Sequence, residues 1–249
     1  MTRKFIAGTS WKMNKTASET ALYLRALLPL LRNTDLSHIE VFILPPFTSL
    51  AAAASLLNAS TIGFGAQNMH WEDAGAWTGE VSAPMLVEAG CRYVEIGHSE
   101  RRTHFGETDE TVNSKVLAAL RHHLTPIVCI GETQDEKMRG DTERVLQRQI
   151  DEALCDVQRE VVPDVILAYE PRWAIGQAEA APPAYIGSIH SFIRSHLARQ
   201  YGTVAEETRI IYGGSVNLNN AAEIMAQTDV DGMFVGRAAL EPNSFARLV

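Results

Sequence analysis

Cysteine is scarce in this sequence. The 249 residues include three, at positions 91, 129 and 155, and no two of them form a C-x-x-C pair. So few cysteines exclude a disulfide scaffold, and free thiols in a reducing compartment fit them best. The histidines show no spacing typical of metal ligands, so we also expect no metal site.

Long apolar runs and an excess of basic residues are missing as well. The longest apolar stretches are far shorter than the roughly 20 residues that cross a bilayer, and the stretch before Ser10 is too short for a signal peptide. Lys and Arg total 22 against 30 Asp and Glu, a net charge of −8, whereas sequence-independent binding of nucleic acid needs a basic surface. We therefore expect a cytoplasmic protein with neither a membrane nor a nucleic-acid partner. Such a chain can still hold a small anion at a locally positive site.

The sequence is instead rich in short, nearly continuous apolar runs. They occupy residues 5–8, 41–44, 62–66, 93–97, 126–131, 165–169, 210–213 and 232–236. Runs of this length predict strands that are buried on both faces, as in a parallel sheet. Apolar residues with helical spacing lie between the runs, for example at Leu24, Leu27 and Leu31.

The alternation of strand and helix patterns continues over the whole chain, without a linker or a low-complexity tract. Eight βα units in 249 residues predict an α/β fold, a single (β/α)8 TIM barrel, with residues 1–249 as one domain. An open, doubly wound sheet is the structural alternative. Against it, the segment 10–14 (Ser-Trp-Lys-Met-Asn) follows the first run, where a dinucleotide-binding fold has a glycine-rich turn.

Polar residues follow the apolar runs at the end where such a barrel has its active site. They are Ser10 and Lys12, Gln67 and Asn68, the segment 98–101, Glu132, Glu170, the segment 213–215, and Gly236 with Arg237. One end of the predicted barrel thus collects a lysine, a histidine, several carboxylates and two glycine-containing turns that can bind an anion.

Several of these segments resemble the triosephosphate isomerase family. The matching blocks are WKMN at 11–14, GHSERR at 97–102, AYEPRWAIG at 168–176, IYGGSV at 211–216 and DGMFVG at 231–236. They occur in family order from one end of the chain to the other. The resemblance implies a homodimeric (β/α)8 barrel that uses neither a metal nor an organic cofactor. It also implies that the loop around Thr78 reaches into the active site of the partner subunit.

The residue types suit the chemistry of this family. Moving a carbonyl group by one carbon needs a base that removes a proton from the adjacent carbon, and donors that stabilise the enediolate oxygens. By resemblance, Glu170 is the base, His98 is the electrophile and Lys12 is the cation beside the developing oxyanion. Glu100 matches a carboxylate that tunes the placement of the lysine.

The resemblance also implies where the substrate phosphate binds. Gly214, Ser215 and Gly236 match the phosphate-binding turns, where free N–H groups and a hydroxyl can hold an anion. Gly176 matches the loop that closes over the substrate and excludes water. The expected ligand is a small phosphorylated sugar.

Three departures from the family pattern lie around the substrate. Ser10 replaces an asparagine, residues 176–179 read Gly-Gln-Ala-Glu in place of Gly-Thr-Gly-Lys, and Arg237 replaces the second of two glycines. In the intersubunit loop, Trp77 stands where phenylalanine is usual. We expect Arg237 to contact the phosphate or the closing loop, with Glu179 as its counterpart.

These departures resemble the L-erythrulose-1-phosphate isomerases of erythritol catabolism. Our main hypothesis is therefore the conversion of L-erythrulose 1-phosphate to D-erythrulose 4-phosphate through a cis-enediolate, with Ser10 making room for the additional CH2OH and hydrogen-bonding it. The alternative is triosephosphate isomerisation, between dihydroxyacetone phosphate and D-glyceraldehyde 3-phosphate. Two further hypotheses are a non-catalytic sugar-phosphate-binding protein and a Schiff-base aldolase with Lys12 as the nucleophile.

Overall fold

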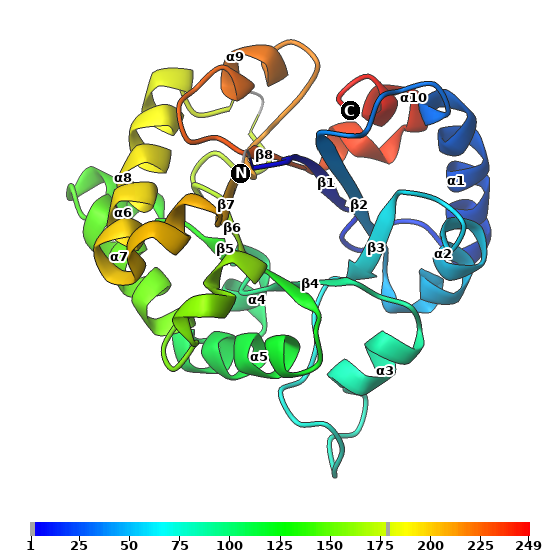
Figure 1. Cartoon of the computed structure of the whole chain (residues 1–249), viewed down its shortest axis with the longest axis horizontal. Coiled ribbons are helices and arrows are strands. Elements are labelled where there is room, and N and C mark those ends of the chain that lie inside the picture. The colour runs from blue at the N-terminus through cyan, green and yellow to red at the C-terminus, as the bar shows by residue number, and fades with distance from the viewer. Residues whose placement is uncertain (1–2, 178–179) are drawn as a thin grey trace.

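Eight parallel strands close into a barrel in the computed structural model, which describes residues 3–177 and 180–249 (Figure 1). The first strand pairs with two neighbours, so Ala7 lies opposite Val41 on one side and opposite Met233 on the other. This closure confirms the predicted (β/α)8 barrel and excludes the open sheet. The strands are β1 (Phe5–Ser10), β2 (Ile39–Leu44), β3 (Gly63–Ala66), β4 (Tyr93–Ile96), β5 (Thr125–Ile130), β6 (Ile166–Tyr169), β7 (Arg209–Tyr212) and β8 (Gly232–Val235).

Helices between the strands form an outer ring around the barrel (Figure 1). Helix α1 (Ala17–Leu31) begins after Thr16, whose hydroxyl accepts from the Glu19 N–H while the Glu19 carboxylate accepts from the Thr16 N–H. The other helices and 3-10 turns are η1 (Phe47–Ser49), α2 (Leu50–Leu57), α3 (Ala83–Glu88), α4 (Ser99–His104), α5 (Asp109–Arg121), α6 (Gln134–Met138), α7 (Thr142–Ala153), η2 (Arg159–Asp164), α8 (Pro183–Tyr201), η3 (Gly202–Glu206), α9 (Ala221–Met225), η4 (Arg237–Leu240) and α10 (Pro242–Ala246). Within residues 3–177 and 180–249, no helix combines the length and the apolar character that crossing a membrane requires.

The strands are buried on both faces, which explains their continuous apolar character. One large cluster packs between the strands and the helices, and a second cluster, which includes Phe42, Tyr93 and Phe234, fills the barrel interior. Side chains alternate along a strand, so the residue that follows Tyr93 toward the interior on β4 is Glu95, which is 3% exposed. A carboxylate thus lies in the interior, one residue before β4 ends.

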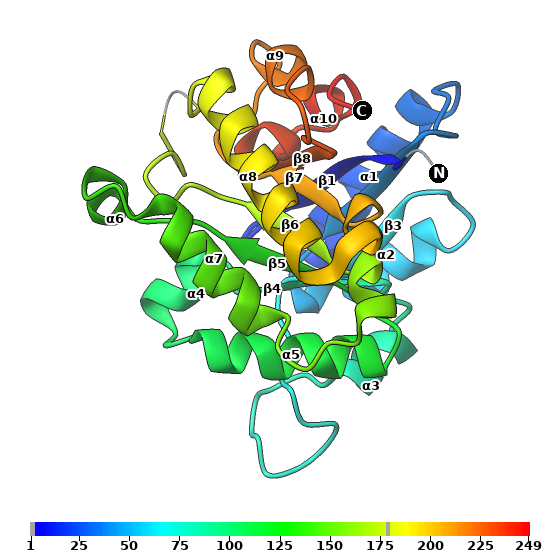
Figure 2. The same ribbon diagram turned by 60° about the vertical axis from the view of Figure 1, so that its left-hand side comes forward.

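A long loop leaves the barrel between β3 and α3 and projects away from the molecule (Figures 1 and 2). At its base, Lys115 on α5 donates a hydrogen bond to Asn68 Oδ1 (2.8 Å). Farther along, the rings of His70 and Trp77 pack with their centroids 4.4 Å apart. Thr78 follows in the exposed part of this loop.

Candidate active site

A cavity of about 570 Å³ lies where the strands end. Its walls come from the segments that follow β1, β4, β6, β7 and β8, as expected from the polar residues after the apolar runs. The predicted site residues that line it are Ser10, Lys12, His98, Glu170, Gly176, Ser215, Gly236 and Arg237. Gly214 lies between two lining residues in the chain without lining the cavity itself, and Glu100 is two residues after the lining His98. Thr78 lies on the projecting loop.

Lys12 occupies a strained turn directly after β1. Its φ is 54°, in the left-handed region that residues with a side chain rarely adopt. The side-chain amide of Gln67 holds this turn by donating to the carbonyls of Lys12 (3.0 Å) and Leu44 (2.8 Å). Lys12 Nζ in turn donates to Glu100 Oε1 at 2.5 Å. The Lys12 amine is thus engaged in an ion pair, whereas a Schiff-base aldolase requires an amine that is free to attack the substrate carbonyl.

His98 precedes helix α4, and this position determines which ring nitrogen carries the proton. Its Nδ1 accepts a hydrogen bond from the Glu100 N–H (3.1 Å), so in the neutral ring the proton is on Nε2. Burial, together with the nearby charge of Lys12, lowers the pKa of His98 to about 4. A neutral imidazole therefore presents an N–H donor to the cavity at physiological pH.

Glu170 follows β6 directly and enters the same cavity. Its Oε2 lies 3.5 Å from His98 Nε2 and accepts no hydrogen bond from the described part of the chain. Gly213 makes room for this side chain, because a Cβ at that position would lie 2.7 Å from Glu170 Cγ. Burial, followed by the negative charge of Glu95, raises the pKa of Glu170 well above its ordinary value. Such a carboxylate can act as a general base toward a carbon held between it and the imidazole.

Glu95 is a charged residue of the cavity that the sequence analysis missed. Ser10 Oγ donates a hydrogen bond to Glu95 Oε2 at 2.7 Å. The hydroxyl that was expected to bind the substrate therefore binds a carboxylate of the protein. Burial raises the pKa of Glu95 to about 7. The signal in the sequence was a charged residue inside an otherwise apolar strand, the run 93–97.

Two carboxylates and an imidazole therefore meet in the cavity. Glu95, His98 and Glu170 each place one possible ligand atom within 4.8 Å of the other two. Such groups can ligate a divalent metal ion, but His98 Nδ1 is already taken up by the backbone of α4. The expectation of a site without a metal or a cofactor stays a prediction.

The opposite side of the cavity is built by the turns after β7 and β8. The Ser215 hydroxyl, which was expected to meet the phosphate, donates to the Ala174 carbonyl (2.9 Å) and so holds the segment expected to close over the substrate. Arg237 Nη2 donates to the Gly176 carbonyl of the same segment (2.9 Å). Arg237 is thus at the closing loop, one of its two expected places, whereas Glu179 lies outside the described residues.

Comparison with known proteins agrees with this geometry. A model of the triosephosphate isomerase family matches residues 4–249. The chain belongs to the triosephosphate isomerase family. The triosephosphate isomerase of Moorella thermoacetica is 49% identical to it, over 100% of this chain and 98% of the relative, and that of Chloroflexus aurantiacus is 49% identical over 98% and 97%. The crystal structure of triosephosphate isomerase from Bartonella henselae matches with a TM-score of 0.89 at 36% identity, over 98% of this chain and 97% of that one.

Membership of the triosephosphate isomerase family confirms the resemblance at the level of the family. The chain is a sugar-phosphate isomerase, and the hypothesis of a non-catalytic binding protein is dropped. The names of the relatives favour triosephosphate isomerisation, our alternative, over the main hypothesis. They give no support to the erythrulose-phosphate branch.

Proposed function

We propose that this isomerase interconverts dihydroxyacetone phosphate and D-glyceraldehyde 3-phosphate. The observation that carries the chemistry is the Oε2 atom of Glu170, which accepts no hydrogen bond from the described residues and lies 3.5 Å from the Nε2 of a neutral His98. The observation that supports the substrate is the set of relatives named triosephosphate isomerase at 44–49% identity. Erythritol catabolism is not part of this proposal, and a cytoplasmic location stays a prediction.

Each residue has a defined step in the proposed reaction. Glu170 removes a proton from the carbon beside the carbonyl and returns it to the neighbouring carbon. The Nε2–H of His98 donates to the substrate oxygens, and the ammonium of Lys12 stabilises the negative charge of the cis-enediolate. Ser215 and Arg237, through their contacts with the segment 174–177, hold the cavity closed to water while the enediolate exists.

L-Erythrulose 1-phosphate, our main hypothesis from the sequence, is the second candidate substrate. It carries one additional CH2OH on the carbon that loses its proton, and the small side chain of Ser10 on the cavity wall favours it. The deciding measurement is kcat/KM for D-glyceraldehyde 3-phosphate and for L-erythrulose 1-phosphate on the same enzyme. A clear advantage for the triose would support the first proposal, and a clear advantage for the tetrulose would replace it.

Arg237→Ala is expected to raise KM for the phosphorylated substrate roughly tenfold. The variant loses the hydrogen bond to the Gly176 carbonyl and a positive charge near the expected phosphate, and an exposed charged hydrogen bond contributes at the low end of about 1.5–3 kcal/mol. Steady-state kinetics measure the effect, with Arg247→Ala, an exposed arginine near the C-terminus, as the control. An unchanged KM would show that Arg237 has no part in substrate binding.

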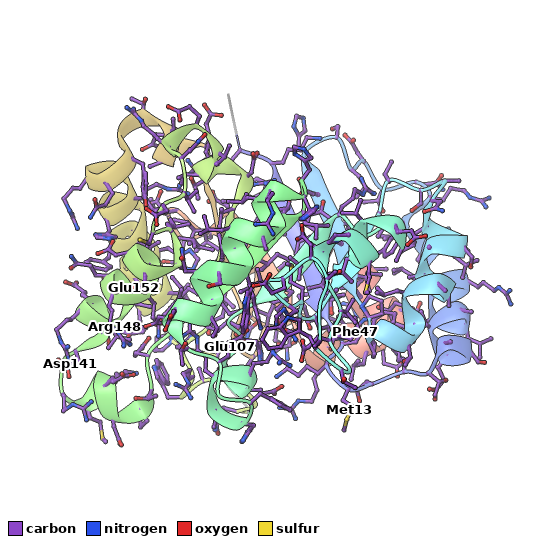
Figure 3. The ribbon with its side chains drawn as sticks, turned by 90° about the horizontal axis from the view of Figure 1, so that it is seen from below. Met13, Phe47, Glu107, Asp141, Arg148 and Glu152 are labelled. Carbon is purple, nitrogen blue, oxygen red and sulfur yellow. The ribbon has the colours of Figure 1, made fainter. Side chains whose placement is uncertain are left out.

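We also propose that the functional form is a homodimer, as the family resemblance implies. Large apolar side chains are exposed on the surface: Met13 is 97% exposed, Trp77 48% and Phe47 39%. Met13 projects from the surface in Figure 3 and directly follows Lys12. A second copy that covers Met13 would therefore also support the strained turn of Lys12.

Thr78→Asp is expected to weaken this dimer and to lower kcat/KM by about tenfold or more, because a charge would be buried in the contact. Sedimentation velocity reports the mass, and the activity is measured at the same protein concentration. Thr203→Asp, at an exposed threonine of η3, is the matched control and should change neither quantity. A wild-type chain that is monomeric and fully active would contradict the proposal.

A further inference from the structure

A buried carboxylate outside the catalytic cavity receives three hydrogen bonds on one oxygen. Glu132 follows β5 and is fully buried. Its Oε1 accepts from Trp173 Nε1 (2.7 Å), from the Tyr185 hydroxyl (3.0 Å) and from the Tyr169 hydroxyl (3.2 Å). Trp173 directly precedes the segment 174–177, and Tyr185 lies beyond that segment, in the first turn of α8. One carboxylate therefore binds side chains on both sides of the segment that is expected to close over the substrate.

These donors exceed what one carboxylate oxygen accepts. A carboxylate has about four acceptor positions, shared equally by its two oxygens. Oε1 of Glu132 receives three donors, whereas Oε2 receives only the Tyr169 hydroxyl, at 3.2 Å, from the described part of the chain. A buried acceptor that loses all its donors costs much more free energy than one that keeps enough of them. Either Trp173 or Tyr185 can therefore leave Oε1 while the other keeps it satisfied.

Trp173 is the least restrained of the three donors. Tyr169 lies on β6 and is fully buried, and Tyr185 belongs to α8, a helix of 19 residues. Trp173 is only half-buried and lies in a turn between these two elements. The Arg172 N–H donates to the Glu132 carbonyl (3.0 Å) and fixes the backbone just before it. A rotation of the segment that follows therefore begins at Trp173 and removes its indole from Glu132.

We propose that Tyr185 is a positioning residue for the isomerisation, because its hydroxyl keeps Glu132 hydrogen-bonded when Trp173 turns away and the segment 174–177 opens. In the present structure, hydrogen bonds from the turns after β7 and β8 hold this segment closed, and the indole is bonded to Glu132 at the same time. Opening breaks the indole bond, and Tyr185 lowers the free energy of that step. This inference rests on the proposed function, in which the segment excludes water during the reaction and opens to release the product.

Tyr185→Phe is expected to tighten the binding of glycerol 3-phosphate, a ligand that does not react. In the open form of this variant, Tyr169 is the one side-chain donor left to Glu132 in the described part of the chain. The closed form, which holds the ligand, therefore gains population. The dissociation constant and the dissociation rate should both fall roughly 3- to 10-fold, the effect of one hydrogen bond. Calorimetry measures the constant, and the phosphorus NMR line shape of the ligand measures the rate.

Two further variants separate this role from a structural one. The tightening should disappear when Tyr185→Phe is made in a Trp173→Phe background, because no indole bond to Glu132 then has to break. Tyr201→Phe is the matched control, the same change at the opposite end of α8, and it should leave both quantities unchanged.

The sign of the effect decides the outcome, since damage to the site would weaken binding and not tighten it. Unchanged or weaker binding in Tyr185→Phe would overturn the inference, and so would equal tightening with and without the Trp173 indole. Turnover of D-glyceraldehyde 3-phosphate by the wild type is measured separately. Its absence would count against the proposed function and not against the binding result.

Discussion

Glu170→Gln is expected to lower kcat for triose phosphate roughly 10²- to 10⁴-fold, the usual contribution of a general base. The amide has nearly the same shape as the carboxylate but does not accept the proton that must leave the substrate carbon. The dissociation constant of glycerol 3-phosphate should stay the same or decrease, because the change removes a negative charge from a cavity that must hold an anion. A coupled assay measures kcat, and calorimetry measures binding.

The separation of the two quantities is what distinguishes a base from a structural residue. If kcat and ligand affinity fell together, the substitution would have damaged the cavity, and the assignment of Glu170 as the general base would be wrong. Glu40→Gln serves as the control, since that carboxylate lies outside the cavity. Glu170→Asp, which withdraws the carboxylate by one methylene, should also lose turnover and retain binding.

The barrel was predictable because its signal is local. Each buried parallel strand is a continuous apolar run, and all eight runs correspond to strands of the barrel. The positions where the strands end were less predictable from the sequence. Strand β1 extends through Ser10, whereas its apolar run ends at Gly8. The two additional residues pair with Ile43 and Leu44 of β2. They belong to the strand because β2 offers them pairing partners, and their own polarity does not indicate this.

The chemistry at the strand ends was also predictable, but the partners of each side chain were not. Lys12, His98 and Glu170 meet because parallel strands end at the same side of a barrel. Ser215 was expected at the phosphate, yet its hydroxyl bonds a carbonyl 41 residues away in the chain. Glu95 was missed because its partner Ser10 is 85 residues distant, and only the closed barrel brings β1 and β4 to face each other.

Glu95→Gln is expected to stabilise the fold at neutral and alkaline pH. Burial raises the pKa of Glu95 from 4.5 to about 7, so between these values the unfolded chain has lost a proton that the folded chain still holds. The free energy of unfolding therefore falls as pH rises through this window, and the loss is complete above the folded pKa. At 1.36 kcal/mol per pH unit, the wild type loses on the order of 3 kcal/mol that the glutamine variant keeps.

Urea unfolding at pH 5, 6, 7 and 8, at one protein concentration, tests this expectation in the wild type, Glu95→Gln and Glu40→Gln. The wild type and the Glu40 variant should lose stability in parallel from pH 5 to pH 8, and the Glu95 variant should lose much less. Titration of Glu170 also lowers the free energy of unfolding as pH rises, and it does so in all three proteins. The pKa of Glu170 is raised by burial and, secondly, by the charge of Glu95. Three parallel curves would show that Glu95 titrates normally and is not under strain. A curve that is flatter only for Glu95→Gln would show that the protein keeps a destabilising carboxylate in its cavity, which is expected of a residue retained for binding rather than for folding.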